Sequence, residues 1–213
     1  MRNPPVTDAA VLTDEDRAEA ASFAAAAGAD AEVVGALVER EVASDHLAYL
    51  AAIRRFSERY LPSRGWSRVL QAGAGAGSGA ILLAERGYDV TVLDADDLRL
   101  RFAQHLLERR GLEAAFLHAD PAEITRESYD AIFCFDASDV ASDAVRAAEA
   151  LRSSVRTGGF LFGGPAFADA IVERYRELKR LGLKAADNFG PGVAPLRRRG
   201  RIGRLAAAAR IPL

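Results

Sequence analysis

The spacing of hydrophobic positions changes at Trp66. Before Trp66, apolar residues recur at helical spacing. After it, short apolar runs alternate with amphipathic segments of helical period, a pattern that favours a parallel sheet with helices on both faces. The helices expected before Trp66 cover residues 13–27, a segment that begins at residue 30, and residues 45–60.

Local start signals support these N-terminal helices. Thr13 precedes three acidic residues, which is typical of a helix start, and Asp30 can cap the second helix. Val34 and Val38 belong to an apolar stripe on that second helix. Pro62 breaks the third helix, so we expect residues 1–62 to be a tail followed by a helical cap.

Residues 63–181 contain the alternating pattern and are expected to form one α/β domain. Residues 129–135 are nearly continuously apolar, as a central strand covered on both faces should be. The strands expected are 67–72, 89–94, 113–118, 129–135 and 159–163, and the helices are 78–87, 97–110, 142–156 and 167–181.

Residues 182–213 carry a weaker pattern, rich in glycine, proline, alanine and arginine. We expect an irregular basic segment in which a short helix over residues 203–210 closes the chain. Its basic run, residues 197–204, is interpreted either as a patch for an anionic substrate or RNA phosphate, or as a solvated tail. No interleaved aromatic residues support base stacking.

Glycines stand at alternate positions directly after the first apolar run, at Gly73, Gly75 and Gly77. A side chain there would hold the backbone away from a ligand, and tight turns often need positive φ. The stretch predicts a turn that holds a nucleotide-like molecule; a plain tight turn is the alternative.

Three further strands are expected to end in acidic residues at the same edge of the sheet. Asp94 ends the second strand, 21 residues after Gly73, where a carboxylate can accept both hydroxyl hydrogens of a ribose. Asp120 precedes Pro121 after the third strand and can accept from the amine of a base, and Asp136 ends the fourth. Asp94 and Asp136 could instead cap the following helices, and Asp120 could be an ordinary turn acid.

Composition narrows the class of protein further. The formal net charge of −2 and the pI of about 6.0 do not favour nucleic acid or membrane as partner. The single cysteine, Cys134, excludes an intrachain disulfide and a cysteine-based zinc cluster, and no metal site is expected. The N-terminus lacks a secretory pattern and the apolar runs are too short to span a bilayer, so we expect a cytoplasmic protein.

The glycine spacing separates two kinds of cofactor. A nicotinamide site has the spacing G-x-G-x-x-G, but the sixth position counted from Gly73 is Ser78, and from Gly75 it is Ala80. The observed G-x-G-x-G spacing suits a ligand without a pyrophosphate, which needs no helix N-terminus for phosphate charge.

Residues 66–165 resemble the class I S-adenosylmethionine-dependent methyltransferases. The stretch from Val69 to Gly77 is similar to the first motif of that family, and Tyr129 to Asp136 resembles its fourth-strand motif. Leu151 to Phe162 resembles the helix, the glycine turn and the fifth strand that follow. The resemblance implies a doubly wound, mainly parallel Rossmann-like α/β sheet and S-adenosylmethionine as cofactor. Since that family's sheet has two further strands, either residues 182–213 leave the sheet trimmed or they form something different.

The resemblance also implies the roles of individual residues. Gly73 and Gly75 would let the backbone approach the methionine portion and the ribose, and Asp94 would hold the ribose hydroxyls. Asp120 and Pro121 would flank the adenine. The cofactor-binding set implied in this way is Gln71, Gly73, Gly75, Asp94, Ala95, Asp120, Pro121 and Asp136.

Two positions depart from the family pattern. Asp136 would sit near the methionine end and face the acceptor, but the motif after it has Val140 where many relatives have a histidine. Gln71 replaces an acid at the head of the first motif and offers no charge to the cofactor's ammonium, which would weaken binding by roughly 1–2 kcal/mol.

The function expected is methyl transfer to a small-molecule acceptor, with the N-terminal helices as a cap. The displacement needs proximity and orientation more than a catalytic group, and the sequence identifies no catalytic residue. His46 could reach the site as a base or be a polar helix position. One alternative is a non-catalytic module that keeps the fold and binds S-adenosylmethionine. A nicotinamide-dependent oxidoreductase is disfavoured by the glycine spacing and by the lack of a recognisable catalytic set.

Overall fold

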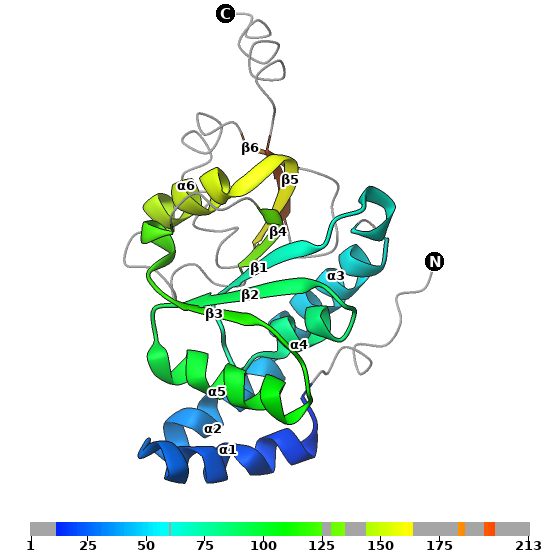
Figure 1. The fold of residues 1–213 in the computed structure, drawn as a ribbon. Helices are drawn as coiled ribbons and strands as arrows, with labels where there is room; N and C mark the ends of the chain where they lie inside the picture. Colours follow the sequence, from blue (N-terminus) through cyan, green and yellow to red (C-terminus); the bar gives the residue numbers. More distant parts are fainter. Residues whose placement is uncertain are drawn as a thin grey trace, which may run out of the picture.

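The computed structural model forms a twisted sheet with helices on both faces (Figure 1). Helices α3, α4 and α5 cover one face, α6 covers the other, and α1 and α2 lie outside α5 as an additional layer. The residues that the structure describes are 12–59, 61–124, 129–134, 144–163, 183–185 and 194–198.

The sheet has the strand order β3-β2-β1-β4-β5-β7-β6. Strands β1 to β5 are parallel, which confirms the expected doubly wound fold, while β7 pairs antiparallel with both β5 and β6. The strands are β1 (Arg68–Ala72), β2 (Asp89–Asp94), β3 (Ala115–His118), β4 (Tyr129–Cys134), β5 (Val155–Gly163), β6 (Leu183–Ala185) and β7 (Ala194–Arg198).

Strands β6 and β7 decide between the two expectations for the C-terminal segment, because they extend the sheet and it is not trimmed. They are 3 and 5 residues long, too short for a periodic signal, and form by pairing with the edge that β5 presents. Pro195 in β7 faces Phe162 of β5 and lies beyond the three residues of β7 that pair with β6. A proline is tolerated at such a position, because within the part of the chain that the structure describes one side of the strand has no ladder there.

Most helices begin where the sequence predicts. Thr13 caps α1 in a capping box: its hydroxyl accepts from the Asp16 amide, and its own amide donates to Asp16 over 2.7 Å. Asp30 caps α2 by accepting from the Glu32 amide at 2.8 Å. The helices are α1 (Asp14–Ala27), α2 (Ala31–Glu41), α3 (Ser44–Arg59), α4 (Ser78–Ala84), α5 (Asp97–Arg109) and α6 (Ala144–Ser154), with short 3-10 turns η2 (Pro62–Arg64) and η3 (Pro121–Glu123).

Residues Val155 and Arg156 lie in β5 instead of ending the preceding helix as expected. A register shift between the pairs Tyr129–Val155 and Ala131–Phe160 lets β5 begin immediately after α6. The helices expected over 167–181 and 203–210 lie outside the described residues.

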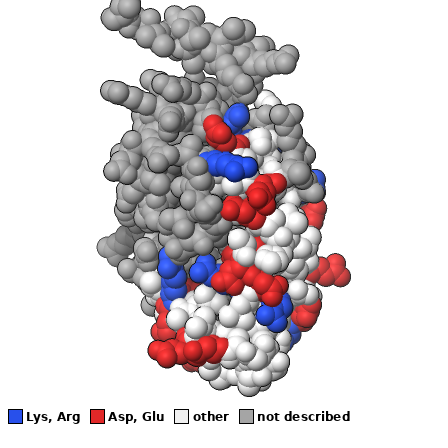
Figure 2. Space-filling model, turned by 90° about the vertical axis from the view of Figure 1, so that its left-hand side faces the viewer, with Lys and Arg blue, Asp and Glu red and all other residues white. Residues whose placement is uncertain are grey.

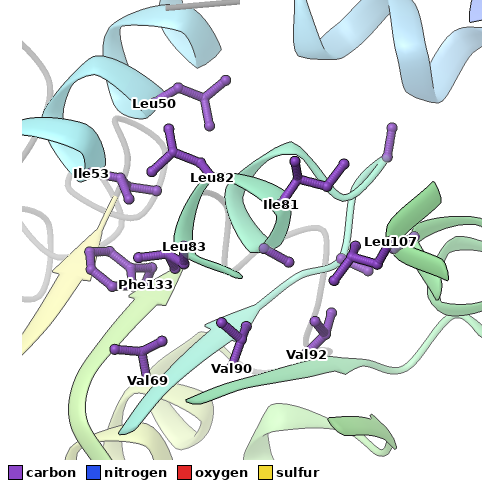
Figure 3. Packing of buried hydrophobic residues seen from close by; sticks show 14 of the residues in the cluster. Leu50, Ile53, Val69, Ile81, Leu82, Leu83, Val90, Val92, Leu107 and Phe133 are labelled. Carbon is purple, nitrogen blue, oxygen red and sulfur yellow. The ribbon is translucent and has the colours of Figure 1, made fainter. Parts of the chain in front are cut away.

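Helix α4 is buried between α3 and the sheet (Figure 3). It presents leucine and isoleucine side chains to both neighbours, so the N-terminal helices and the sheet share one core. The fully buried side chains in this sandwich include Ile53 of α3, Ile81, Leu82 and Leu83 of α4, and Val69 and Val92 of the strands.

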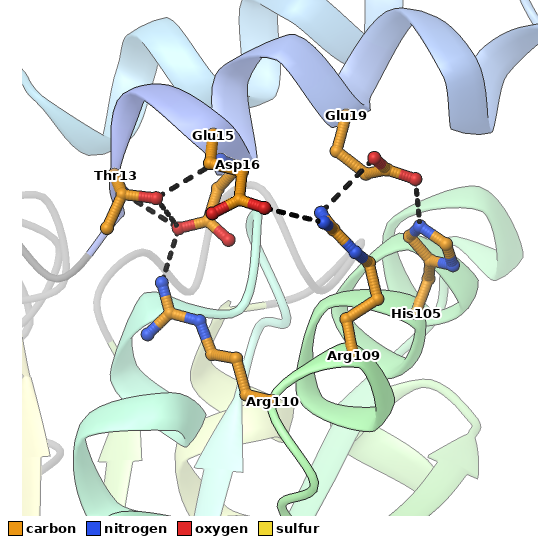
Figure 4. A network of polar contacts seen from close by, with 7 residues as sticks. All are labelled: Thr13, Glu15, Asp16, Glu19, His105, Arg109 and Arg110. Atoms are coloured by element: carbon orange, nitrogen blue, oxygen red, sulfur yellow. Dashed lines mark hydrogen bonds and ion pairs between the residues drawn. The ribbon is translucent and has the colours of Figure 1, made fainter.

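Ionic contacts fix α1 against α5 (Figure 4). Arg110 pairs with Asp16, and Glu19 contacts both Arg109 at 3.2 Å and His105 Nε2 at 3.0 Å. Burial acts to raise the pKa of Asp16, but its hydrogen bonds with Thr13 and Arg110 hold the pKa below its ordinary value. His105 is half-buried in this contact.

Candidate cofactor site

The glycine turn between β1 and α4 lies at the carboxyl end of the strands. Gly73, Gly75 and Gly77 all have positive φ, +86°, +54° and +96°. A Cβ at Gly77 would lie 3.2 Å from Ala103 of α5, so that glycine serves helix packing. A Cβ at Gly75 would lie 2.3 Å from Glu41 Oε1, so that glycine admits a polar group to the face of the turn.

Glu41, the last residue of α2, inserts its carboxylate at this turn. Oε1 accepts from the Ala76 amide at 2.8 Å, and Oε2 accepts from the Ser78 hydroxyl and lies 2.8 Å from His46 Nε2. Glu41 is 4% exposed. Burial acts to raise its pKa, but His46, Ser78 and Ala76 together hold that pKa below its ordinary value. The carboxylate is therefore ionised at neutral pH.

His46 belongs to this cluster and is buried, at 8% exposure. Besides Glu41, its Nε2 lies 3.1 Å from Ser78 Oγ. The interpretation of His46 as a polar helix position is therefore too simple, because its Nε2 lies 2.8 Å from the buried Glu41 carboxylate.

Gln71 is buried beneath the turn, where its Nε2 donates to the Gly73 carbonyl at 3.1 Å. A Cβ at Gly79 would lie 2.7 Å from Gln71 Oε1, so the fourth glycine of the stretch makes room for this amide. Tyr49 of α3 reaches the same place. Burial raises the pKa of Tyr49 well above its ordinary value.

Asp94 lies at the end of β2 against the same turn and is 1% exposed. Its Oδ2 accepts from the Ala74 amide at 2.7 Å and its Oδ1 from the Asp96 amide at 2.8 Å. Burial raises the pKa of Asp94, partly offset by those hydrogen bonds. The interpretation of Asp94 as a helix cap is wrong, because Asp96 caps α5 through Leu98 and Arg99.

The remaining predicted residues are less closely grouped. Asp120 accepts from the Ala122 amide at 2.7 Å and caps η3, in agreement with the turn-acid interpretation, and Pro121 is buried. Ala95 is exposed, and its carbonyl lies 2.9 Å from His118 Nε2. Asp136, like Asp139 and Val140, lies outside the described residues.

The hydrogen bonds already made by the backbone N–H groups of the glycine turn indicate which kind of ligand the turn can bind. The N–H groups of residues 73 and 77 bond to backbone carbonyls, and those of Ala74 and Ala76 donate to the carboxylates of Asp94 and Glu41. A pyrophosphate is repelled by these two carboxylates. A ligand with hydroxyls and positive charge is compatible with both acids, so the donor set fits S-adenosylmethionine better than a dinucleotide.

Sequence reasoning missed Glu41 and Ser78 as members of this site. Glu41 stands 35 positions before Ala76 and belongs to no recognisable motif. Ser78 stands inside the glycine stretch but could be interpreted only as part of the turn.

A Rossmann-like sheet with a glycine turn after β1 and an acid at the end of β2 defines the class of cofactor-binding α/β proteins. Residues 69–159 match the methyltransferase domain family. Glycine N-methyltransferase from Oryctolagus cuniculus is 32% identical over 121 residues, which cover 47% of this chain and 41% of that protein. Residues 69–159 are thus similar to methyltransferases, and the chain spans less than half the length of this relative.

Solved structures support the fold. A putative S-adenosyl-L-methionine-dependent methyltransferase from Methanococcus maripaludis has a TM-score of 0.56 at 15% identity, over 72% of this chain and 88% of that one. N-methyltransferase NodS from Bradyrhizobium japonicum, solved with S-adenosyl-L-homocysteine, has a TM-score of 0.55 at 17% identity, over 78% and 97%. The [4+2]-cyclase SpnF has a TM-score of 0.52 at 17% identity, over 69% and 81%. The same architecture is thus found in proteins described as methyltransferases and in one described as a cyclase.

Proposed function

We propose that this protein binds S-adenosylmethionine and transfers its methyl group to a small-molecule acceptor. The observation that carries the proposal is the pairing of the turn amides with the carboxylates of Asp94 and Glu41. This pairing leaves the turn suited to a cationic ligand that bears hydroxyls. The family match over residues 69–159 and the curated glycine N-methyltransferase relative support the same conclusion.

The chain's residues would act mainly by binding and orienting. Asp94 has two oxygens with about four acceptor positions, and backbone amides take two of them, so the others can accept ribose hydroxyls. Gly73 and Gly75 permit close approach of the backbone to the ligand, Asp120 and Pro121 would flank the adenine, and Asp136 would lie near the acceptor.

S-adenosylmethionine supplies a methyl group on a sulfonium, which is already a good leaving group. Alignment of the acceptor with that methyl group therefore provides most of the rate, and a general base is needed only if the acceptor is protonated in the ground state. Among the described residues we assign no catalytic base.

The proposal of a small-molecule acceptor rests on two observations. The N-terminal helices dock on the turn through Glu41 and so cover the site from one side. On the face shown in Figure 2, acidic and basic side chains of the described residues are intermixed, with no extended basic field for nucleic acid. The side chains of the basic run 197–204 lie outside the described residues.

We place the protein in the cytoplasm because its single cysteine, Cys134, is a buried thiol compatible with a reducing compartment. No helix among the described residues has the length and apolar character needed to cross a bilayer.

A non-catalytic function is the second candidate. Gln71 and Val140 depart from the family pattern. The [4+2]-cyclase SpnF has a similar fold, so this architecture alone does not imply methyl transfer. Such a module would bind the cofactor without turning it over.

Two experiments separate these functions. Titration calorimetry with S-adenosylmethionine, S-adenosylhomocysteine and NAD should give heat with the two sulfur compounds and none with NAD. An absence of heat with both sulfur compounds at millimolar concentration would refute the proposal that the protein binds S-adenosylmethionine. Transfer of a labelled methyl group into the low-molecular-weight fraction of a metabolite extract tests turnover, and labelling of only the macromolecular fraction would contradict the acceptor class.

A further inference from the structure

The glycine turn lacks an acid at the head of its motif but receives one from another part of the chain. Gln71 is neutral and its amide is engaged with the Gly73 carbonyl. We propose that Glu41 binds the ammonium group at the amino-acid end of the cofactor, and so supplies from α2 the negative charge that Gln71 does not offer. This inference rests on the proposed function and deepens it.

The position of the carboxylate supports this role. Glu41 Oε1 lies where a Cβ on Gly75 would be, within 2.3 Å, so only a glycine leaves the carboxylate in place. Glu41 itself is 4% exposed, whereas Gly73 and Gly75 are partly accessible. A ligand lying along the turn would therefore meet Oε1 at the boundary between the core and the site.

The two oxygens of Glu41 are not equally satisfied. Oε2 has two partners, the Ser78 hydroxyl and His46 Nε2. Among the described residues Oε1 accepts only the Ala76 amide. A carboxylate oxygen can accept two hydrogen bonds. Oε2 has both of its partners, so the acceptor position still open to a ligand is on Oε1, the oxygen next to Gly75.

The charge of Glu41 carries two costs for the fold, beside the contacts that hold it. The residue ends α2, where the helix dipole disfavours negative charge, and its burial carries a desolvation cost. His46 and Ser78 hold the carboxylate in its ionised form. A buried, ionised carboxylate at such a position is suited to form an ion pair with a positively charged group of the ligand.

The first test compares Glu41→Gln with the matched control Glu39→Gln, by calorimetry. Glu39 stands two positions earlier on α2 and is exposed. We expect the Kd for S-adenosylhomocysteine to rise about tenfold or more in Glu41→Gln and to stay unchanged in Glu39→Gln, since a charged hydrogen bond is lost only in the former. The Kd for 5′-methylthioadenosine, which lacks the amino-acid end, should change less than about twofold in either variant.

The second test changes the ligand and needs no variant. Wild-type protein should bind S-adenosylhomocysteine about tenfold or more tightly than an analogue in which hydrogen replaces the amino group. In Glu41→Gln this preference should shrink to near equality. Adding Gln71→Glu to Glu41→Gln should restore part of the affinity for S-adenosylhomocysteine, because it puts an acid back at the head of the motif.

The outcomes separate this inference from the proposed function. If wild-type protein binds neither S-adenosylhomocysteine nor S-adenosylmethionine, the proposed function fails and this inference with it. If wild-type protein binds S-adenosylhomocysteine but Glu41→Gln binds it equally well or more tightly, only the inference fails; tighter binding would mean that Glu41 occupies space the ligand needs. If Glu41→Gln does not fold, equal wild-type affinity for the amino and deaminated ligands still overturns the inference.

Discussion

Replacement of Gly75 by alanine tests how the glycine turn and Glu41 fit together. The new methyl group would lie 2.3 Å from Glu41 Oε1, and the residue has φ +54°, which side chains rarely adopt. Oε1 is at the end of a flexible side chain and could in principle move. However, three donors hold this carboxylate, from Ala76, Ser78 and His46, so moving it breaks buried contacts.

The expected loss of stability has two parts. A positive φ costs a non-glycine residue about 1–2 kcal/mol. Displacing the carboxylate removes at least one hydrogen bond to a charged group, at about 1.5–3 kcal/mol. Gly75→Ala should therefore lower the free energy of unfolding by about 2.5–5 kcal/mol. Gly87→Ala is the matched control, because Gly87 has φ +76° and no atom within 4 Å of the added Cβ. It should cost only about 1–2 kcal/mol.

The assay is urea denaturation followed by the fluorescence of Trp66, the chain's single tryptophan. A double-mutant cycle with Glu41→Ala isolates the contact. In the Glu41→Ala background, Gly75→Ala should cost about as much as Gly87→Ala, because only the backbone penalty remains. Equal losses for Gly75→Ala and Gly87→Ala in the wild-type background, or additive losses in the cycle, would refute the reasoning.

Three further predictions concern other parts of the molecule. Asp94→Ala should raise the Kd for S-adenosylhomocysteine at least about tenfold by removing charge-assisted hydrogen bonds, and unchanged affinity in calorimetry would reject the ribose assignment. In the folded protein the pKa of Asp16 lies below its ordinary value of 3.8. The ionised carboxylate therefore stabilises the fold at pH values above 3.8, and this contribution is lost as the pH falls through the lowered pKa. Urea unfolding should therefore show wild-type protein more stable than Asp16→Asn near neutral pH, with a difference that shrinks below pH 3.8; a pH-independent difference would contradict the role of the Arg110 contact. Phe56→Ala should lower the free energy of unfolding by about 3–5 kcal/mol, since this fully buried ring lies against three other phenylalanines, and a loss below about 1 kcal/mol would show that the core collapses around it.

Local signals explain why the strands and most helix starts could be predicted. The sequence predicts a strand from Asp89 to Asp94, directly before an amphipathic segment, and the observed strand has these same bounds. Thr13 and Asp30 cap their helices through residues two or three positions away, so a short stretch of sequence contains the whole interaction. Asp94 could be placed at the turn because parallel strands bring their carboxyl ends to one edge.

Structure that depends on pairing could not be predicted in the same way. Strand β6 has three residues, and its conformation comes from the neighbour that it pairs with, not from its own composition. The start of β5 at Val155 likewise depends on a register shift against Tyr129, while the local sequence continues the helical pattern. In both places the backbone hydrogen bonds of a neighbouring strand decide the outcome.

Glu41 shows the same limit at the site itself. On its own helix it is one acid among several, and only the packing of α2 against α3 and α5 brings it to Ala76. Its presence changes the meaning of Gln71, because an acid absent from the motif need not be absent from the turn. Position 71 is filled by an amide that bonds to Gly73 and reaches Tyr49. A carboxylate at position 71 would add a second buried negative charge to the turn, at a cost in electrostatic repulsion until a positively charged ligand binds. We therefore interpret the amide at Gln71 and the buried acid at Glu41 together: the negative charge of the turn comes from position 41 in place of position 71.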